Sequence, residues 1–160
     1  MTTLTMLQEA VTDLLIQGGI PAMGTFPKED RVHPSQPLAV VGVKEVAVTP
    51  AAFGDCLGDH SDGEVLGQQA RVTCRLALYS PPEVGEEGCR QLLDRTAGVI
   101  FRGRPGGLRL EQWVMGEVAF DQTRGMFRAD LTVKYHGMLT AVAAGETFFL
   151  DFTVKGGFTI

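Results

Sequence analysis

Two helical patterns of apolar residues stand out along the chain. The first predicts an amphipathic helix over residues 6–17, with Thr5 and Gln8 placed as a capping box and Gly18 as a stop signal. The second predicts a helix over residues 83–101, because apolar and small residues recur there every three or four positions and acidic residues come first.

The remaining periodic segments have the alternation or the valine-rich composition of β-strands. Residues 38–48 predict a first strand and residues 70–79 a second. Residues 112–120 and 126–139 predict two strands that a short polar turn joins as a hairpin. A last alternating segment, residues 147–155, predicts one more strand or an arm.

The alternation gives each predicted strand an apolar face and a polar face. The polar positions include Arg71, Arg75, Arg128, Lys134 and His136. The apolar positions should pack against the helices. The expected core of helix and sheet includes Leu92, Leu93, Leu131 and Val133.

The order helix, strand, strand, helix, hairpin, strand predicts an α+β fold. We expect a mostly antiparallel β-sheet with two amphipathic helices packed on one face, which leaves the other face available. A length of 160 residues suits one domain. We assign residues 1–139 to this domain and residues 140–160 to a C-terminal extension.

Between the first two predicted strands, residues 50–69 show no sustained period. This segment is expected to form an exposed acidic loop. Its order of acids does not fit an EF-hand, so a solvated or partner-facing loop is favoured and no metal site is predicted. The residues concerned are Asp55, Asp59, His60, Asp62 and Glu64.

Composition narrows the function classes. A net charge of −5 argues against a protein that coats nucleic acid. No apolar run approaches the roughly 20 residues that span a bilayer, and the first residues lack the features of a signal peptide, so no membrane association is expected. The spacing of Cys56, Cys74 and Cys89 fits neither a zinc motif nor a disulfide framework, which predicts reduced thiols.

Catalytic motifs are missing from the sequence. Cys74 and His136 fall on opposite faces of the predicted sheet, so they do not form a dyad. Cys56 and His60 share the acidic loop, but no orienting group or oxyanion signature accompanies them. No phosphate-binding loop is present. We therefore predict neither an enzyme nor a bound cofactor, with a small cysteine-dependent hydrolase as a remote alternative.

Basic residues are the main candidates for an interface. Arg102, Arg104 and Arg109 surround the glycine-rich segment at 103–107. With no aromatic residue among them, contact with an acidic protein neighbour is favoured over nucleic-acid binding. The same role is proposed for Arg71, Arg75, Arg128 and Lys134 on the polar sheet face, and the acidic loop is a further candidate contact.

The layout over residues 3–139 resembles the lambda-type tail terminator family of long-tailed phages and related contractile particles. The resemblance lies in the opening amphipathic helix and the proline-rich lead into LAVVGV. It continues in the strand QARVTCRLALYSP, the helix EEGCRQLLDRTAGVIF and the closing hairpin VMGEVAFDQTRGMFRADLTVKYHGML.

The resemblance implies a homo-oligomeric ring, expected to be hexameric, that caps the tail tube and ends its polymerisation. Its expected partners are the tail tube protein, the neck or head connector and, as a further candidate, the sheath. DNA could pass through the ring without specific binding. Such a protein would be made in the bacterial host cytoplasm and become part of the virion or tail-like particle. Another tail or neck component, such as a tube subunit or connector protein, is the alternative.

Overall fold

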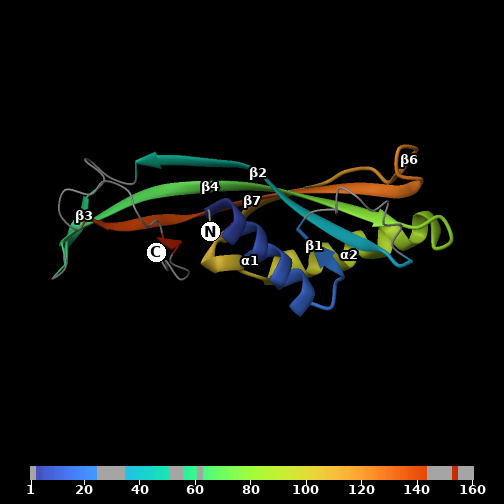
Figure 1. Cartoon of the computed structure of the whole chain (residues 1–160), viewed down its shortest axis with the longest axis horizontal. Coiled ribbons are helices and arrows are strands. Elements are labelled where there is room, and N and C mark those ends of the chain that lie inside the picture. Colours follow the sequence, from blue (N-terminus) through green and yellow to red (C-terminus); the bar gives the residue numbers. More distant parts are fainter. Residues whose placement is uncertain (1–2, 25–34, 51–55, 61–62, 144–152, 155–160) are drawn as a thin grey trace.

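The computed structural model describes residues 3–24, 35–50, 56–60, 63–143 and 153–154 (Figure 1). The helices are α1 (Thr3–Gln17), α2 (Gly85–Arg102) and the short 3-10 helix η2 (Pro105–Gly107). The strands are β1 (Ala22–Met23), β2 (Leu38–Pro50), β3 (Cys56–His60), β4 (Gly63–Ser80), β5 (Arg109–Met115), β6 (Ala119–Asp121), β7 (Met126–Ala143) and β8 (Thr153–Val154).

One sheet holds these strands, with the main order β1-β2-β4-β7-β5. Only the short β1–β2 pairing is parallel; the other described pairings are antiparallel. The long strands β4 and β7 pair without a register shift from Glu64 opposite Ala143 to Ser80 opposite Phe127. Figure 1 shows α1 and α2 on one side of this sheet, while β4 and β7 continue past the helices toward β3. The predicted α+β class is confirmed.

The core lies between the helices and the inner face of the sheet. Leu131 and Val133 of β7 are fully buried, and Leu92 and Leu93 of α2 belong to the same cluster. The predicted core is therefore confirmed at all four positions. Burying apolar side chains from both layers supplies the main stabilising term of the fold.

Two glycines let the helices approach each other closely. A Cβ added at Gly18 would lie 2.6 Å from the Val99 side chain, and one added at Gly103 would overlap the Leu14 side chain. The absence of side chains at these two sites sets the approach of α1 to α2.

α1 ends at Gln17, directly before the predicted stop at Gly18. The backbone turn that ends it is at Gly19, with φ at 79°, where the Gly19 N–H donates to the Ile16 carbonyl and the Ile20 N–H to the Leu15 carbonyl.

The predicted capping box is wrong, because α1 begins at Thr3 and already contains Thr5 and Gln8. The Gln8 side-chain amide instead donates hydrogen bonds to the Gly24 carbonyl and, at 2.8 Å, to the Val41 carbonyl. A glutamine in the first turns thus fastens the helix to the edge of β2, a tertiary contact that local spacing cannot reveal.

The predicted loop at 50–69 is also wrong over its described part. Residues 56–60 form β3, and β4 begins at Gly63, seven residues before the predicted strand. The extra length is paired on both sides, by β2 up to Pro50 opposite Gln68 and by β7 up to Ala143 opposite Glu64. Ladder hydrogen bonds from two neighbours outweigh the weak strand preference of glycine and acidic residues.

The predicted hairpin at 121–125 is confirmed. Gly125, with φ at 66°, donates its N–H to the Asp121 carbonyl at 2.8 Å, and β6 pairs with the start of β7. The strand expected at 112–120 divides into β5 and β6, because Gly116 leaves the regular ladder to donate to the Asp130 carbonyl at 2.7 Å.

The C-terminal part is described only in part. β7 continues past residue 139 to Ala143, and β8 pairs Val154 with Leu139. The rest of the predicted segment 147–155 lies outside the described residues. Its two described residues form a strand, as predicted.

Candidate interaction face

The outer face of the sheet, which the helices do not cover, carries most of the predicted interface residues. The register places Arg71 opposite His136, Thr73 opposite Lys134, and Tyr79 opposite Arg128. Arg71, Arg75 and Lys134 are exposed, and Arg128 is half-buried. The sequence therefore identified the correct face for Arg71, Arg75, Arg128 and Lys134. Their contact with a partner stays a prediction.

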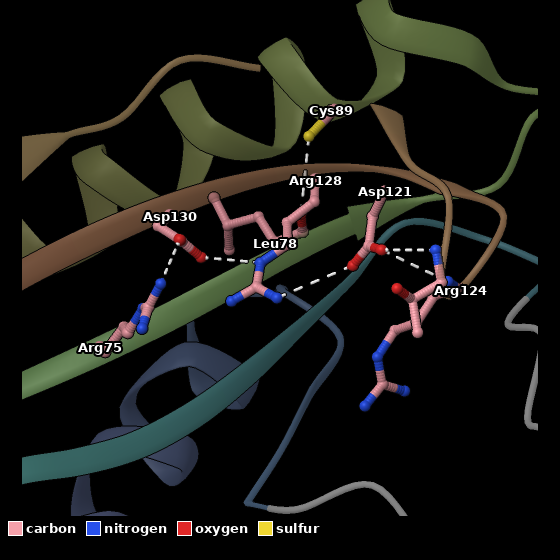
Figure 2. A network of polar contacts seen from close by, with 8 residues as sticks. Arg75, Leu78, Cys89, Asp121, Arg124, Arg128 and Asp130 are labelled. Atoms are coloured by element: carbon pink, nitrogen blue, oxygen red, sulfur yellow. Dashed lines mark hydrogen bonds and ion pairs between the residues drawn. The ribbon is translucent and has the colours of Figure 1, made fainter. Parts of the chain in front are cut away.

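An ion-pair network occupies one end of this face (Figure 2). The Asp130 carboxylate accepts a hydrogen bond from Arg75 at 2.7 Å and another from Arg128 at 3.0 Å. Arg128 also lies 3.8 Å from Asp121. The Asp121 carboxylate accepts from the turn N–H groups of Thr123 and Arg124, at 2.9 and 3.4 Å. The network thus joins β4, β7 and the hairpin turn.

Tyr79 is buried at this end of the sheet, although its position in the alternation predicts a wetter surface. Its side chain is 3% exposed and forms a small cluster with Ala77 and Met126. The guanidinium groups of Arg124 and Arg128 each lie 5.4 Å from the centre of its ring. Cation–π contact and the apolar stems of the arginines explain how a polar face covers an aromatic side chain.

The pKa of the Asp130 carboxyl is lowered from its usual value. Burial by itself would raise the pKa, but the hydrogen bonds from Arg75 and Arg128 favour the charged form and outweigh burial. A carboxyl whose pKa is lower in the folded state stabilises the fold above its unfolded pKa of about 3.9. That stabilisation is lost as the pH falls through the folded-state pKa.

Asp130→Asn should therefore lower stability at pH 7 by about 1 kcal/mol and flatten its acid dependence. The estimate is at the upper end for exposed ion pairs, because one carboxylate serves two arginines. Urea unfolding at pH 7 and pH 3 measures both effects. Glu86→Gln, which removes the exposed 2.6 Å pair with Arg90, is the control and should cost under about 0.5 kcal/mol. Equal pH dependence of wild type and Asp130→Asn would contradict the assignment.

Two cavities lie farther along the outer face, on either side of a loose ion pair between Arg71 and Glu111 at 3.7 Å. The larger has a volume of about 330 Å³, and its lining includes Arg71, Arg109, Glu111 and His136 together with Leu108. The smaller, about 210 Å³, is lined by Glu45, Thr73, Gln112 and Lys134.

The three arginines expected around the glycine-rich segment do not share one surface. Arg102 lies at the end of α2 and donates to the Gly98 carbonyl at 3.1 Å. Arg104 immediately precedes η2, whereas Arg109 begins β5 and lies opposite His136 in the sheet. The sequence therefore missed the grouping of Arg109 and His136 with Arg71. It depends on register between three strands, for which local alternation gives no signal.

Only part of the predicted acidic cluster lies within the described residues. Asp59 and His60 belong to β3, and Asp59 pairs in register with Glu64. Asp55 and Asp62 lie outside the described residues. Over the described ranges, no three His, Cys, Asp or Glu side chains are grouped in a way that could hold a metal ion.

The two described thiols are poor candidates for nucleophiles. Burial raises the pKa of Cys74 to about 12, and burial is also the main cause that raises the pKa of Cys89 to about 11. Both thiols are therefore protonated at neutral pH. Cys74 lies on the inner face and His136 on the outer face, as predicted.

Cys56 and His60, the other candidate pair, lie at opposite ends of the same strand, β3. Four residues of strand separate their Cα atoms by about 13 Å, which does not favour a dyad.

No protein-family model matches this sequence, and no curated protein matches it either. Among the described helices, none is both long and apolar enough to cross a membrane. A functional interpretation therefore depends on the geometry of the outer face and on the resemblance in sequence layout.

Proposed function

We propose that this protein is a ring-forming structural protein of the tail terminator type, which caps a phage-type tail tube and ends its polymerisation. Its axial partners would be the tube protein, the neck or head connector and, in contractile particles, the sheath. The observation that carries the proposal is the uncovered outer face of the sheet, with its arginines, lysine and two cavities.

The free edges of the sheet supply a second kind of contact surface. β1 pairs with β2 only at Ala39 and Val40, so the described part of β2 beyond Val41 has a strand partner on one side only. β5 is the opposite edge of the main sheet, and Val48, Val114 and Met115 are exposed large apolar side chains on these two strands. Different surfaces at opposite edges are what a closed ring of identical subunits requires.

Intrachain pairing revises which basic residues are free to contact a partner. Arg75 and Arg128 form ion pairs with Asp130, so they stabilise the sheet and are less available to an acidic residue of a partner. No described acid lies within ion-pair distance of Lys134, and the Arg71–Glu111 pair is loose, with 74% of the Arg71 side chain exposed. Arg71 and Lys134 are therefore the better candidates on this face.

The test is to measure the mass of the purified protein in solution and to image it with the tube protein. We expect discrete rings, alone or on tube ends, and shorter tubes as the protein is added. A protein that stays monomeric with tube protein present, and leaves tube length unchanged, would overturn the proposal.

A tube subunit or connector protein is the second candidate, because open sheet edges equally suit a subunit that polymerises. The same images separate the two functions. A terminator remains a closed ring at fixed subunit number, whereas a tube subunit forms stacks whose length grows with protein concentration.

A further inference from the structure

Three side chains that can carry positive charge form one row across the outer face. Arg71 of β4 lies opposite His136 of β7, and His136 lies opposite Arg109 of β5. Adjacent strands are about 4.8 Å apart, so this row places two guanidinium groups and an imidazole side by side. The two guanidinium groups lie on either side of His136, so an acid placed over the row would interact favourably with both.

Acidic side chains of the same chain neutralise this basic row only in part. Glu111 contacts Arg71 at 3.7 Å, and both side chains are substantially exposed. Within the described residues, no acid lies at ion-pair distance from Arg109. The row also lines the cavity of about 330 Å³, which has room for a carboxylate-bearing side chain. Its wall carries two guanidinium groups and one acid, Glu111, and this excess of positive charge suits a carboxylate ligand.

Packing of Leu108 against β7 shapes this cavity. Leu108 is 2% exposed, and a Cβ added at Gly137 would lie 2.5 Å from its side chain. A glycine at this position lets the start of β5 close over β7, which brings Arg109 into the row. The cavity is thus built by the fold and does not arise from surface side chains alone.

Another part of the sheet places two acidic residues at paired strand positions. In the β3–β4 pairing, Asp59 lies opposite Glu64, so two acids are cross-strand neighbours. This pairing lies near the end of the extension that runs past the helices (Figure 1). Two acidic residues at paired strand positions suit a partner of opposite charge.

A single subunit cannot bring the two arrangements together. Glu64 and Arg71 lie on the same continuous strand, β4, whose rise separates them by roughly 23 Å. The acidic end and the basic row can therefore meet only between two copies of the chain. When such a contact repeats head to tail, it forms a ring if the rotation between subunits closes.

We infer that the cavity lined by Arg71, His136 and Arg109 receives a carboxylate from the Asp59–Glu64 end of a second copy of this chain. The inference rests on the proposed ring, since it assigns one contact within it. The interaction stabilises the ring and weakens as salt concentration rises.

A charge-swap experiment tests the inference. The acceptor variant carries Arg71→Glu and Arg109→Glu, the donor variant carries Asp59→Lys and Glu64→Lys, and a third variant carries all four changes. Light scattering and analytical ultracentrifugation measure self-association, and circular dichroism verifies folding. Arg90→Glu with Arg95→Glu on α2 is the matched charge control.

We expect the acceptor and donor variants each to weaken self-association about tenfold or more. The four-change variant, or an equimolar mixture of the acceptor and donor variants, should recover it. The control should assemble like the wild type. If the acceptor variant does not fold, the donor variant combined with Arg109→Glu alone provides the recovery test.

The inference would be overturned if the donor variant self-associates like the wild type, or if combining the acceptor and donor changes restores nothing. The proposed function would still stand in that case, provided that the wild type forms rings. A wild type that never self-associates, even with tube protein, would overturn both.

Discussion

Replacing Leu131 with alanine is expected to lower the free energy of unfolding by about 2–5 kcal/mol. Leu131 is 0% exposed at the centre of the sheet, opposite Leu76 of β4 and Met115 of β5. It belongs to the core cluster that includes Leu92 and Leu93 of α2. The loss combines the removed apolar burial with the cavity left in a layer that rigid strands hold on both sides.

Urea or thermal unfolding measures this loss. Lys134→Ala is the matched control, because it changes the same strand three residues away on the exposed outer face. The control should cost less than about 1 kcal/mol, mainly through strand preference. A Leu131→Ala cost below that of the control would mean that the helices do not pack on this part of the sheet.

Much of the fold could be predicted because periodicity reports burial directly. In β7, alternate residues Ala129, Leu131, Val133 and Tyr135 are all buried. The spacing in α2 likewise identified its buried face, and its predicted bounds differ from Gly85–Arg102 by only one or two residues. These segments have one face in the core and one in water, so a single pattern determines both structure and orientation.

The segment at 50–69 shows where such reasoning fails. Glycines and acids there predict a loop, yet β3 and the first part of β4 pair as strands. β3 and β4 form a local pairing, but the first part of β4 also pairs with β7, far away in sequence, as at Glu64 opposite Ala143. This tertiary pairing overrides local preference. The predicted role of Gln8 was wrong for the same reason, since its hydrogen-bond partner Val41 is distant along the chain.

The candidate site was predictable as a face but not as a set of contacts. Alternation placed Arg71, Arg75 and Arg128 on the outer face. It could not show that Asp130 already binds two of them, because that depends on the register of β4 against β7. Reversing the charge of all three arginines would therefore disturb the sheet itself, and partner contacts are better tested through Arg71 and Arg109.

Tyr135 should respond in opposite ways to two substitutions. Its side chain is 0% exposed on the inner face, between Val72 and Leu110 in register. Tyr135→Ala should cost about 3–5 kcal/mol, since it removes an aromatic ring from the core. Tyr135→Phe should cost nothing, because the hydroxyl has no hydrogen-bond partner among the described residues. Removing such an unpaired group could even add about 1 kcal/mol.

The same hydroxyl predicts a difference at alkaline pH. Burial, and then the neighbouring thiol of Cys74, raise the pKa of Tyr135 above its usual value. A group whose pKa is raised in the folded state stabilises the fold fully below its unfolded pKa of about 10, and that stabilisation is lost at higher pH. Wild type should therefore lose more stability than Tyr135→Phe between pH 8 and pH 11, measured by urea unfolding. Cys74 titrates in both proteins and cancels in the comparison. Parallel losses, or a cost of more than about 1 kcal/mol for Tyr135→Phe at pH 7, would mean that the hydroxyl is hydrogen-bonded in the folded protein.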